Sequence, residues 1–223
     1  MFAISPIKVK ICCIRSADEA RTALSFGAAA LGLVSEMPAG PGEIPEDVIR
    51  EITDAVPPTA GTFLLTAVTD VDELIRKVTH CGVNTLQLWD ALHEIDYARL
   101  RLGLPYVSLV QAVHVLDQSA IRQARRLAGL VDALVLDSCN RQVPYRWETQ
   151  SGKTHDWEIS RQIVKAVNCP VLLAGGLTAN NVELAVERVR PYGVDACTGV
   201  RTDNKLDTRK LVAFFEALRR SPH

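Results

Sequence analysis

The sequence predicts an α/β protein with the fold of a (β/α)8 TIM barrel, formed as a single domain over residues 1–223. Eight short apolar runs with strand character alternate with eight amphipathic stretches of helical periodicity. That number of β-then-α units in 223 residues suits a barrel near its minimum size. Because no low-complexity run or linker divides the chain, we expect one continuous domain.

Four of the expected strands follow a recurring pattern, in which a glycine ends an amphipathic stretch and an apolar run comes next. The four glycines are Gly27, Gly82, Gly129 and Gly193. Because glycine tolerates the left-handed backbone that ends many helices, we expect each of them to stop a helix. Three further runs follow prolines, which are tolerated at a strand start, and an eighth opens the chain. The strand runs are 9–14, 27–34, 62–66, 82–88, 106–114, 129–136, 171–176 and 193–198.

The expected helices alternate with these strands, at roughly 17–26, 46–55, 70–81, 93–101, 117–128, 157–167, 179–190 and 207–220. Four aspartates lie near helix starts, where a carboxylate suits the helix dipole and the free N–H groups: Asp18, Asp70, Asp117 and Asp207. A doubly wound open sheet is the competing fold. That fold typically has a glycine-rich turn after its first strand. Residues 12–16 contain no glycine, which disfavours it.

Composition excludes several classes of protein. The chain has 25 Lys and Arg against 26 Asp and Glu, and this near-neutral balance gives no long-range field for nucleic acid or an anionic membrane. No apolar stretch reaches the roughly 18–20 residues of a membrane span, and the first residues lack a charged signal region, so we expect a cytoplasmic protein. The six cysteines form no CxxC pair and no zinc spacing, so we expect no metal. The oligomeric state leaves no signal in the sequence.

Small and polar residues gather where the last two expected strands end. Gly175 and Gly176 end the seventh strand, and Thr198 and Gly199 end the eighth. In barrels, the loops after these two strands often bind phosphate through backbone N–H groups. Glycine lets the backbone approach an anion closely, and threonine adds a hydroxyl. These four residues therefore predict a phosphate site, with a simple tight turn at the glycine pair as the alternative.

Cys12 and Asp137 are the candidates for acid–base chemistry at the same rim. Asp137 ends an apolar run, where partial desolvation should raise its pKa and suit a general acid; capping or pairing with an arginine is the alternative. A cation such as Arg15 could lower the pKa of Cys12 and make it a thiolate base; a small core residue is the alternative. By strand parity, at most one of Cys12 and Cys13 points into the barrel. His114 ends the fifth strand on this rim.

Five stretches, in order along nearly the whole chain, resemble the phosphoribosylanthranilate isomerase family. They are 8–15 (KVKICCIR), 132–138 (DALVLDS), 156–157 (DW), 173–182 (LAGGLTANNV) and 191–200 (PYGVDACTGV). The resemblance implies a (β/α)8 barrel and an isomerase of tryptophan biosynthesis. It further implies an Amadori rearrangement that converts N-(5-phosphoribosyl)anthranilate to an enol-form deoxyribulose phosphate. The family uses neither a metal nor an organic cofactor.

The resemblance also implies roles for individual residues. The family's cysteine base falls on Cys12 and its aspartate acid on Asp137. Asp137 would protonate the ring oxygen as the furanose opens, and Cys12 would remove the proton from C2. The phosphate groups of the family match Gly175, Gly176, Thr198 and Gly199, and Asp195 matches a family aspartate near the substrate.

The sequence also departs from the family. Cys13 replaces a glycine, and the Ser-Pro-Arg after strand two, whose arginine holds the anthranilate carboxylate, is replaced by 38–43 with no arginine. The family segments after strands four and six are replaced by 88–92 and 149–152. His114 and Arg201 stand where the usual residues differ in charge or size. Losing an arginine–carboxylate pair should weaken recognition of anthranilate, and Arg15 or Arg201 is a candidate to replace it.

Three functional hypotheses follow. The first is the family isomerisation, with Cys12 as base, Asp137 as acid, and Arg15, His114, Asp195 and Arg201 as further substrate-binding candidates. The second is an isomerase or epimerase that uses the same acid–base pair on another phosphosugar. The third is a non-catalytic protein that binds a phosphometabolite, which an outward-facing Cys12 would favour. In each hypothesis the partner is a small phosphorylated molecule.

Overall fold

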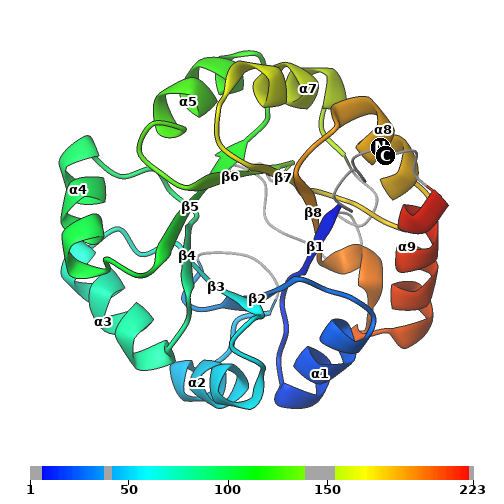
Figure 1. The fold of residues 1–223 in the computed structure, drawn as a ribbon, viewed down its shortest axis with the longest axis horizontal. Helices are drawn as coiled ribbons and strands as arrows, with labels where there is room; N and C mark the ends of the chain where they lie inside the picture. The colour runs from blue at the N-terminus through cyan, green and yellow to red at the C-terminus, as the bar shows by residue number, and fades with distance from the viewer. Residues whose placement is uncertain (1–6, 38–41, 139–153, 221–223) are drawn as a thin grey trace, which may run out of the picture.

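The structure, a computed structural model, describes residues 7–37, 42–138 and 154–220. Eight parallel strands close into a barrel in which each strand pairs with the next and β8 pairs with β1 (Figure 1). The strands are β1 (Lys8–Ile11), β2 (Ala30–Val34), β3 (Gly61–Thr66), β4 (Thr85–Leu88), β5 (Ser108–His114), β6 (Ala133–Asp137), β7 (Val171–Leu173) and β8 (Gly193–Ala196). The predicted (β/α)8 barrel is confirmed.

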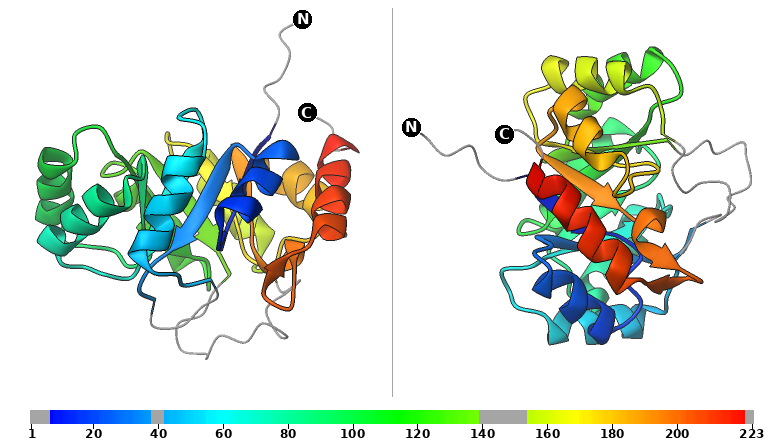
Figure 2. Two further views of the ribbon diagram at one scale, coloured as in Figure 1. Left: turned by 90° about the horizontal axis from the view of Figure 1, so that it is seen from below. Right: turned by 90° about the vertical axis from the view of Figure 1, so that its right-hand side faces the viewer.

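Helices surround the strands on the outside of the barrel, as Figures 1 and 2 show. They are α1 (Ala17–Ser25), α2 (Glu46–Ala55), α3 (Val71–Cys81), α4 (Glu94–Gly103), α5 (Ser119–Leu127), α7 (Trp157–Ala166), α8 (Val182–Val189) and α9 (Thr208–Arg220). Between β8 and α9 lie a short 3-10 turn, η1 (Thr198–Val200), and a two-stranded ribbon, β9 (Arg201–Thr202) and β10 (Lys205–Leu206). In the described part of the chain, every helix is too short or too polar to traverse a lipid bilayer.

Alternate residues of each strand face the helices or the barrel interior. The helix-facing residues join the main apolar core, as Leu134 and Leu136 of β6 do. Val135, between them, joins an interior cluster with Val110, Leu172 and Ala174. This alternation identifies the side chains that line the interior, because every second residue of a strand shares a face.

The left-handed backbone expected at the four glycines occurs at two of them, Gly27 and Gly82. Gly82 caps α3 in the left-handed region at φ 66°, and Gly27 has φ 105° just after α1. Gly129 and Gly193 do not adopt positive φ, and α8 ends instead on Arg190 at φ 53°. Gly193 opens β8, where a Cβ would lie 2.6 Å from the carbonyl oxygen of Lys8. Close approach of β1, rather than a helix stop, therefore requires glycine at this position.

Three of the four aspartates cap helices as expected. Asp70 accepts a hydrogen bond from a first-turn N–H of α3 at 2.9 Å, and Asp117 accepts one from α5 at 2.7 Å. Asp207 accepts one from α9 at 2.9 Å. In α1 the cap is Ser16, whose hydroxyl accepts an N–H at 3.2 Å, while Asp18 lies within the first turn. These bonds fix where each helix leaves the rim of the barrel.

We predict that His155, just before α7, makes the stability of the fold depend on pH. Its Nε2 lies 2.5 Å from the hydroxyl of buried Ser160, and burial lowers the pKa of His155 to about 4. In the unfolded chain a histidine titrates near pH 6.5, so its contribution is complete above that pH and is lost as the pH falls toward 4. Urea unfolding at pH 7 and pH 5 should differ by about 1–2 kcal/mol from this group. His155→Gln should remove this difference in unfolding free energy between the two pH values. If the variant and the wild-type protein show the same pH dependence, the prediction is wrong.

Candidate active site

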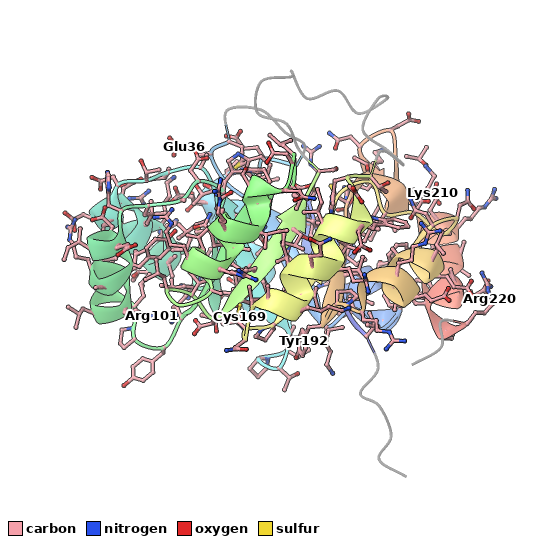
Figure 3. All side chains as sticks on the ribbon, turned by 90° about the horizontal axis from the view of Figure 1, so that it is seen from above. Glu36, Arg101, Cys169, Tyr192, Lys210 and Arg220 are labelled. Carbon is pink, nitrogen blue, oxygen red and sulfur yellow. The ribbon has the colours of Figure 1, made fainter. Side chains whose placement is uncertain are left out.

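The carboxyl ends of the eight strands form one edge of the barrel, where barrel enzymes carry their catalytic groups. Figure 3 shows Glu36, which follows β2, at this edge, and Arg101, Cys169 and Tyr192 at the opposite edge. Cys169 and Tyr192 precede β7 and β8, so the lower edge holds the strand starts. The residues predicted as a site lie at or just after strand ends, with the exceptions of Asp195 inside β8 and Arg201, which opens β9.

Cys12 follows β1 directly and faces the barrel interior. It is 6% exposed and belongs to a cluster with Val34, Leu65, Trp89 and Ala112, which come from β2, β3, β4 and β5 or their ends. The residues that alternate with these along the strands pack in the helix-facing core instead. The thiol therefore lies inside the barrel, near the mouth.

Cys13 corrects the parity argument. Strand pairing ends at Ile11, and Cys13 adopts φ 63°, a left-handed conformation that a cysteine rarely takes. Because the backbone turns there, Cys12 and Cys13 join the same buried cluster, and their side chains hydrogen bond to each other. Cys197, after β8, packs against the same cluster, and its thiol forms a hydrogen bond with that of Cys13. Three sulfurs therefore meet below the mouth.

The cation near Cys12 is Lys10. Arg15 is exposed, and its backbone N–H donates a hydrogen bond to the carboxylate of Glu19 at 3.0 Å. The hydrogen bond with Cys13 and burial raise the pKa of the Cys12 thiol well above its ordinary value, while the charge of Lys10 acts in the opposite direction. In the free protein Cys12 is thus a protonated thiol at neutral pH, and the expected cation stands two residues before it rather than three after.

Asp137 is the last residue of β6 and shares the interior face with Val135. It is half-buried and lies opposite His114 in the pairing of β5 with β6. The ring of His114 meets the ring of Trp89 edge-on, with centroids 4.5 Å apart. Trp89 packs in the cluster of Cys12, so neighbouring residues connect this cluster through Trp89 and His114 to the strand position of Asp137.

The glycines after β7 and β8 come together in the structure. Gly175 and Gly176 both have positive φ, 83° and 64°. Asn181 holds this turn, since its side chain donates to the carbonyl of Gly176 at 3.0 Å and accepts from the N–H of Thr178 at 2.8 Å. Gly199 lies within η1, directly against the backbone of the turn after β7. The two loops therefore form one continuous backbone surface at the mouth.

Gly199→Ala is expected to disrupt this surface. A Cβ there would collide with the carbonyl oxygen of Leu177, and backbone cannot move aside as a side chain can. We expect a loss of about 2–4 kcal/mol of unfolding free energy, or a displaced loop with weakened phosphate binding. Gly129→Ala is the matched control, because the nearest atom to its Cβ is 3.9 Å away. Urea unfolding and phosphate titration measure both; equal behaviour of the two variants would contradict the prediction.

Two substrate-binding candidates are engaged in ion pairs. Asp195 is 7% exposed, and its Oδ2 lies 2.6 Å from Lys10 Nζ. Arg201 is 3% exposed; its Nη2 donates to Glu19 at 2.8 Å and to the carbonyl of Asn204 at 3.0 Å. Both side chains are held by the protein itself, while Arg15 extends from the rim into solvent.

The segment after β2, where the family arginine is missing, is anchored at both sides of residues 38–41. Glu36 has φ 45°, and its carboxylate lies 2.9 Å from Lys77 Nζ. Lys77 is 4% exposed and also pairs with Glu46 at 2.6 Å. The backbone of Glu43 pairs with that of Val34 in an isolated parallel β-bridge. Residues 38–41 and the altered segment 149–152 lie outside the described part of the chain.

Sequence reasoning missed two residues at this site. Trp89 received no role from the sequence, yet its ring contacts that of His114 at the mouth. Lys10 received no role, although it precedes Cys12 by two residues and so shares its face of the strand. That spacing was the available signal. In residues 7–37, 42–138 and 154–220, no cluster of His, Cys, Asp and Glu side chains has the geometry to hold a metal ion.

The closed barrel and its polar, glycine-lined strand ends define a (β/α)8-barrel enzyme. A family model described as N-(5'phosphoribosyl)anthranilate (PRA) isomerase matches residues 9–217. The N-(5'-phosphoribosyl)anthranilate isomerase of Haloferax volcanii is 35% identical over 211 residues, which are 94% of this chain and 91% of the relative. That of Methanocella arvoryzae is 32% identical over 213 residues, 95% of this chain and 98% of the relative. The chain belongs to the phosphoribosylanthranilate isomerase family.

Solved structures agree on the fold. The phosphoribosyl anthranilate isomerase of Thermotoga maritima matches with a TM-score of 0.83 at 22% identity, covering 96% of this chain and 98% of that one. The enzyme of Thermococcus kodakaraensis matches with a TM-score of 0.77 at 27% identity, covering 96% and 99%. A third isomerase structure, with a TM-score of 0.80 at 21% identity, is a complex with reduced 1-(o-carboxyphenylamino)-1-deoxyribulose 5-phosphate and covers 96% and 98%.

Proposed function

We propose that this protein isomerises N-(5'-phosphoribosyl)anthranilate in tryptophan biosynthesis, in the cytoplasm, without metal or organic cofactor. Cys12 acts as the general base and Asp137 as the general acid. One observation carries the proposal: both side chains face the barrel interior at the same end, from strands that are not neighbours. Family membership supports the same chemistry.

The mechanism needs an acid and a base on different sides of one sugar. Asp137 gives a proton to the furanose ring oxygen as the ring opens, leaving a Schiff base between C1 and the anthranilate nitrogen. Cys12 is a thiol in the free protein, so it acts as a base only after its own proton has passed to solvent. The resulting thiolate takes the proton from C2, and the C2–H electrons form the C1–C2 double bond of the enolamine while the C=N electrons move to nitrogen. General acid–base groups must stand within hydrogen-bond reach of the atoms they serve, which an interior mouth lined by both allows.

The phosphate and aromatic ends of the substrate have separate candidates. Gly175, Gly176, Thr198 and Gly199 hold the phosphate, since their two loops form one backbone surface beside the mouth. His114, beside Asp137 and against Trp89, faces the aromatic end. Arg15 is the exposed cation available to an anthranilate carboxylate, because Arg201 is bound to Glu19 and Asp195 to Lys10.

Rescue of a tryptophan auxotroph that lacks this isomerase tests the proposal. We expect the wild-type gene to restore growth without tryptophan, and Cys12→Ala and Asp137→Asn to fail at equal protein level. Purified wild-type protein should turn over N-(5'-phosphoribosyl)anthranilate, followed by the loss of its fluorescence. If the wild-type protein neither rescues nor turns over this compound, the substrate assignment is wrong; if both variants retain full turnover, the catalytic assignment is wrong.

A second candidate is an isomerase or epimerase of the same scaffold with another phosphosugar. The segment after β2 favours it, because residues 38–43 contain no arginine for the anthranilate carboxylate. Binding of ribulose 5-phosphate, with no turnover of the anthranilate compound, would support it. A non-catalytic role called for Cys12 among the outer helices, and Cys12 faces the interior instead.

A further inference from the structure

Lys10 places a positive charge inside the barrel, below the mouth. Its neighbours Val9 and Ile11 belong to the helix-facing core, so the Lys10 side chain points inward, where it is 1% exposed. A buried ammonium is costly unless it is paired, and sequences retain such a group where it has a partner or a task.

Asp195 is the partner of Lys10. The two residues lie opposite each other in the pairing of β1 with β8, and Lys10 Nζ donates to Asp195 Oδ2 at 2.6 Å. The ammonium also lies 5.4 Å from the centre of the Phe63 ring, a distance typical of a cation–π contact. An ammonium has three protons to donate, and this carboxylate oxygen takes one of them.

The sulfur of Cys12 is the next group along the same face. A Cβ at Gly32, on the adjoining strand β2, would lie 2.5 Å from Cys12 Sγ and 2.9 Å from Lys10 Nζ. The sulfur and the ammonium therefore both border the space beside Gly32. The distance between Cys12 Sγ and Lys10 Nζ cannot exceed the sum of these two distances. Within such a distance, in a buried site, a positive charge favours the anionic form of its neighbour.

We propose that Lys10 is a positioning residue for the reaction, whose ammonium stabilises the thiolate of Cys12, and that Asp195 limits this effect by holding the ammonium. The proposal rests on the assignment of Cys12 as the base. When C2 gives its proton to the sulfur, the thiolate becomes a neutral thiol, and Lys10 stays protonated with Asp195 as its counter-ion. No proton leaves Lys10 at any step.

Three neighbouring groups act on the titration of Cys12. Cys13 hydrogen bonds to it and raises its pKa, and the carboxylate of Asp195 also raises it. Lys10 lowers it. Cys197 hydrogen bonds to Cys13 on the side away from Cys12 and is not among the groups that shift the pKa of Cys12. Because Lys10 and Asp195 act in opposite directions, removing each charge in turn gives results of opposite sign.

The test measures the alkylation rate of Cys12 by iodoacetamide against pH, with the modified peptide identified by mass spectrometry. The midpoint is the pH at which the alkylation rate reaches half of its maximum. Lys10→Met should raise this midpoint by about one pH unit or more, and Asp195→Asn should lower it by about one pH unit. Lys77→Met is the matched control, another buried lysine paired with a carboxylate, and should leave the midpoint unchanged. A midpoint unmoved by Lys10→Met, or moved in the same direction by both variants, overturns the proposal.

A further variant covers the case in which a single unpaired charge prevents folding. Lys10→Met with Asp195→Asn removes both charges, which costs a fold less than removing one. Its midpoint should lie above that of Asp195→Asn; an equal or lower midpoint overturns the proposal. The assay needs no substrate, so absence of isomerase turnover in the wild-type protein defeats the proposed function without affecting this result. Where turnover is present, Lys10→Met should reduce kcat more than it changes KM.

Discussion

Cys12→Ala is expected to reduce kcat for N-(5'-phosphoribosyl)anthranilate by about 10²–10⁴-fold, the usual contribution of a positioned general base. The variant loses the proposed base, while Asp137 and the loops of the proposed phosphate site remain in place. Because the thiol is buried, alanine leaves a small void that should lower the unfolding free energy by about 1 kcal/mol, while KM should change little. Steady-state kinetics, with urea unfolding as the check on folding, measure all three quantities.

Cys169→Ala is the matched control for this loss. Cys169 precedes β7 at the opposite edge of the barrel, far from the strand ends (Figure 3). The same chemical change there should leave kcat within about twofold of wild type, because exposed or remote substitutions rarely alter a catalytic step. If both cysteine variants retain wild-type kcat, Cys12 is not the base, and the mechanism needs another group at the mouth.

Asp137→Asn should produce a loss of similar size, about 10²–10⁴-fold in kcat/KM, since the proposed general acid could then give no proton to the ring oxygen as the C–O bond breaks. Asparagine keeps the shape of the side chain and its position at the end of β6, which separates loss of the acid from loss of structure. We expect phosphate binding, followed by inorganic phosphate as a competitive inhibitor, to remain close to wild type, because the glycine turns belong to other loops.

Asp132→Asn is the control for this substitution, just before the start of the same strand. Asp132 accepts from the backbone N–H of Leu109 at 2.7 Å and pairs with Arg101, at the edge opposite the mouth. The variant is expected to be somewhat less stable and fully active. Equal activity of the two asparagine variants would remove Asp137 from the mechanism.

The fold was predictable from the sequence because its signals are local and repeated. A strand that is apolar on both parities, a helix with one apolar face, and an aspartate at a helix start each depend on neighbouring residues alone. The predicted helices and strands consequently coincide with the observed ones to within a few residues, as for 46–55 and α2 (Glu46–Ala55). The glycine pattern failed at Gly193 because the constraint there is the approach of another strand, which no local signal reports.

The sequence predicted that the candidate residues would lie at one edge of the barrel, but not which charges they would meet. Strand ends in a barrel meet at one edge, so the topology alone places Cys12 and Asp137 at the same end. The orientation of Cys13 depends on its positive φ, which follows from how the rim packs rather than from strand parity. The cation beside Cys12 comes from two residues earlier on the same face, and its partner Asp195 lies 185 positions away.

The amino-acid order by itself determined the number and sequence of the strands and helices, the closure into a barrel, and the residue types available at its mouth. It did so because apolar residues recur every two residues along a strand buried on one face and about every 3.6 residues along a helix, and form a continuous run along a strand buried on both faces. Tertiary structure alone decided which charges meet, as in the pairing of Lys10 with Asp195, and which side chains share the interior. Those outcomes depend on strand register and on distances across the barrel, and electrostatic effects at a buried thiol change steeply with both.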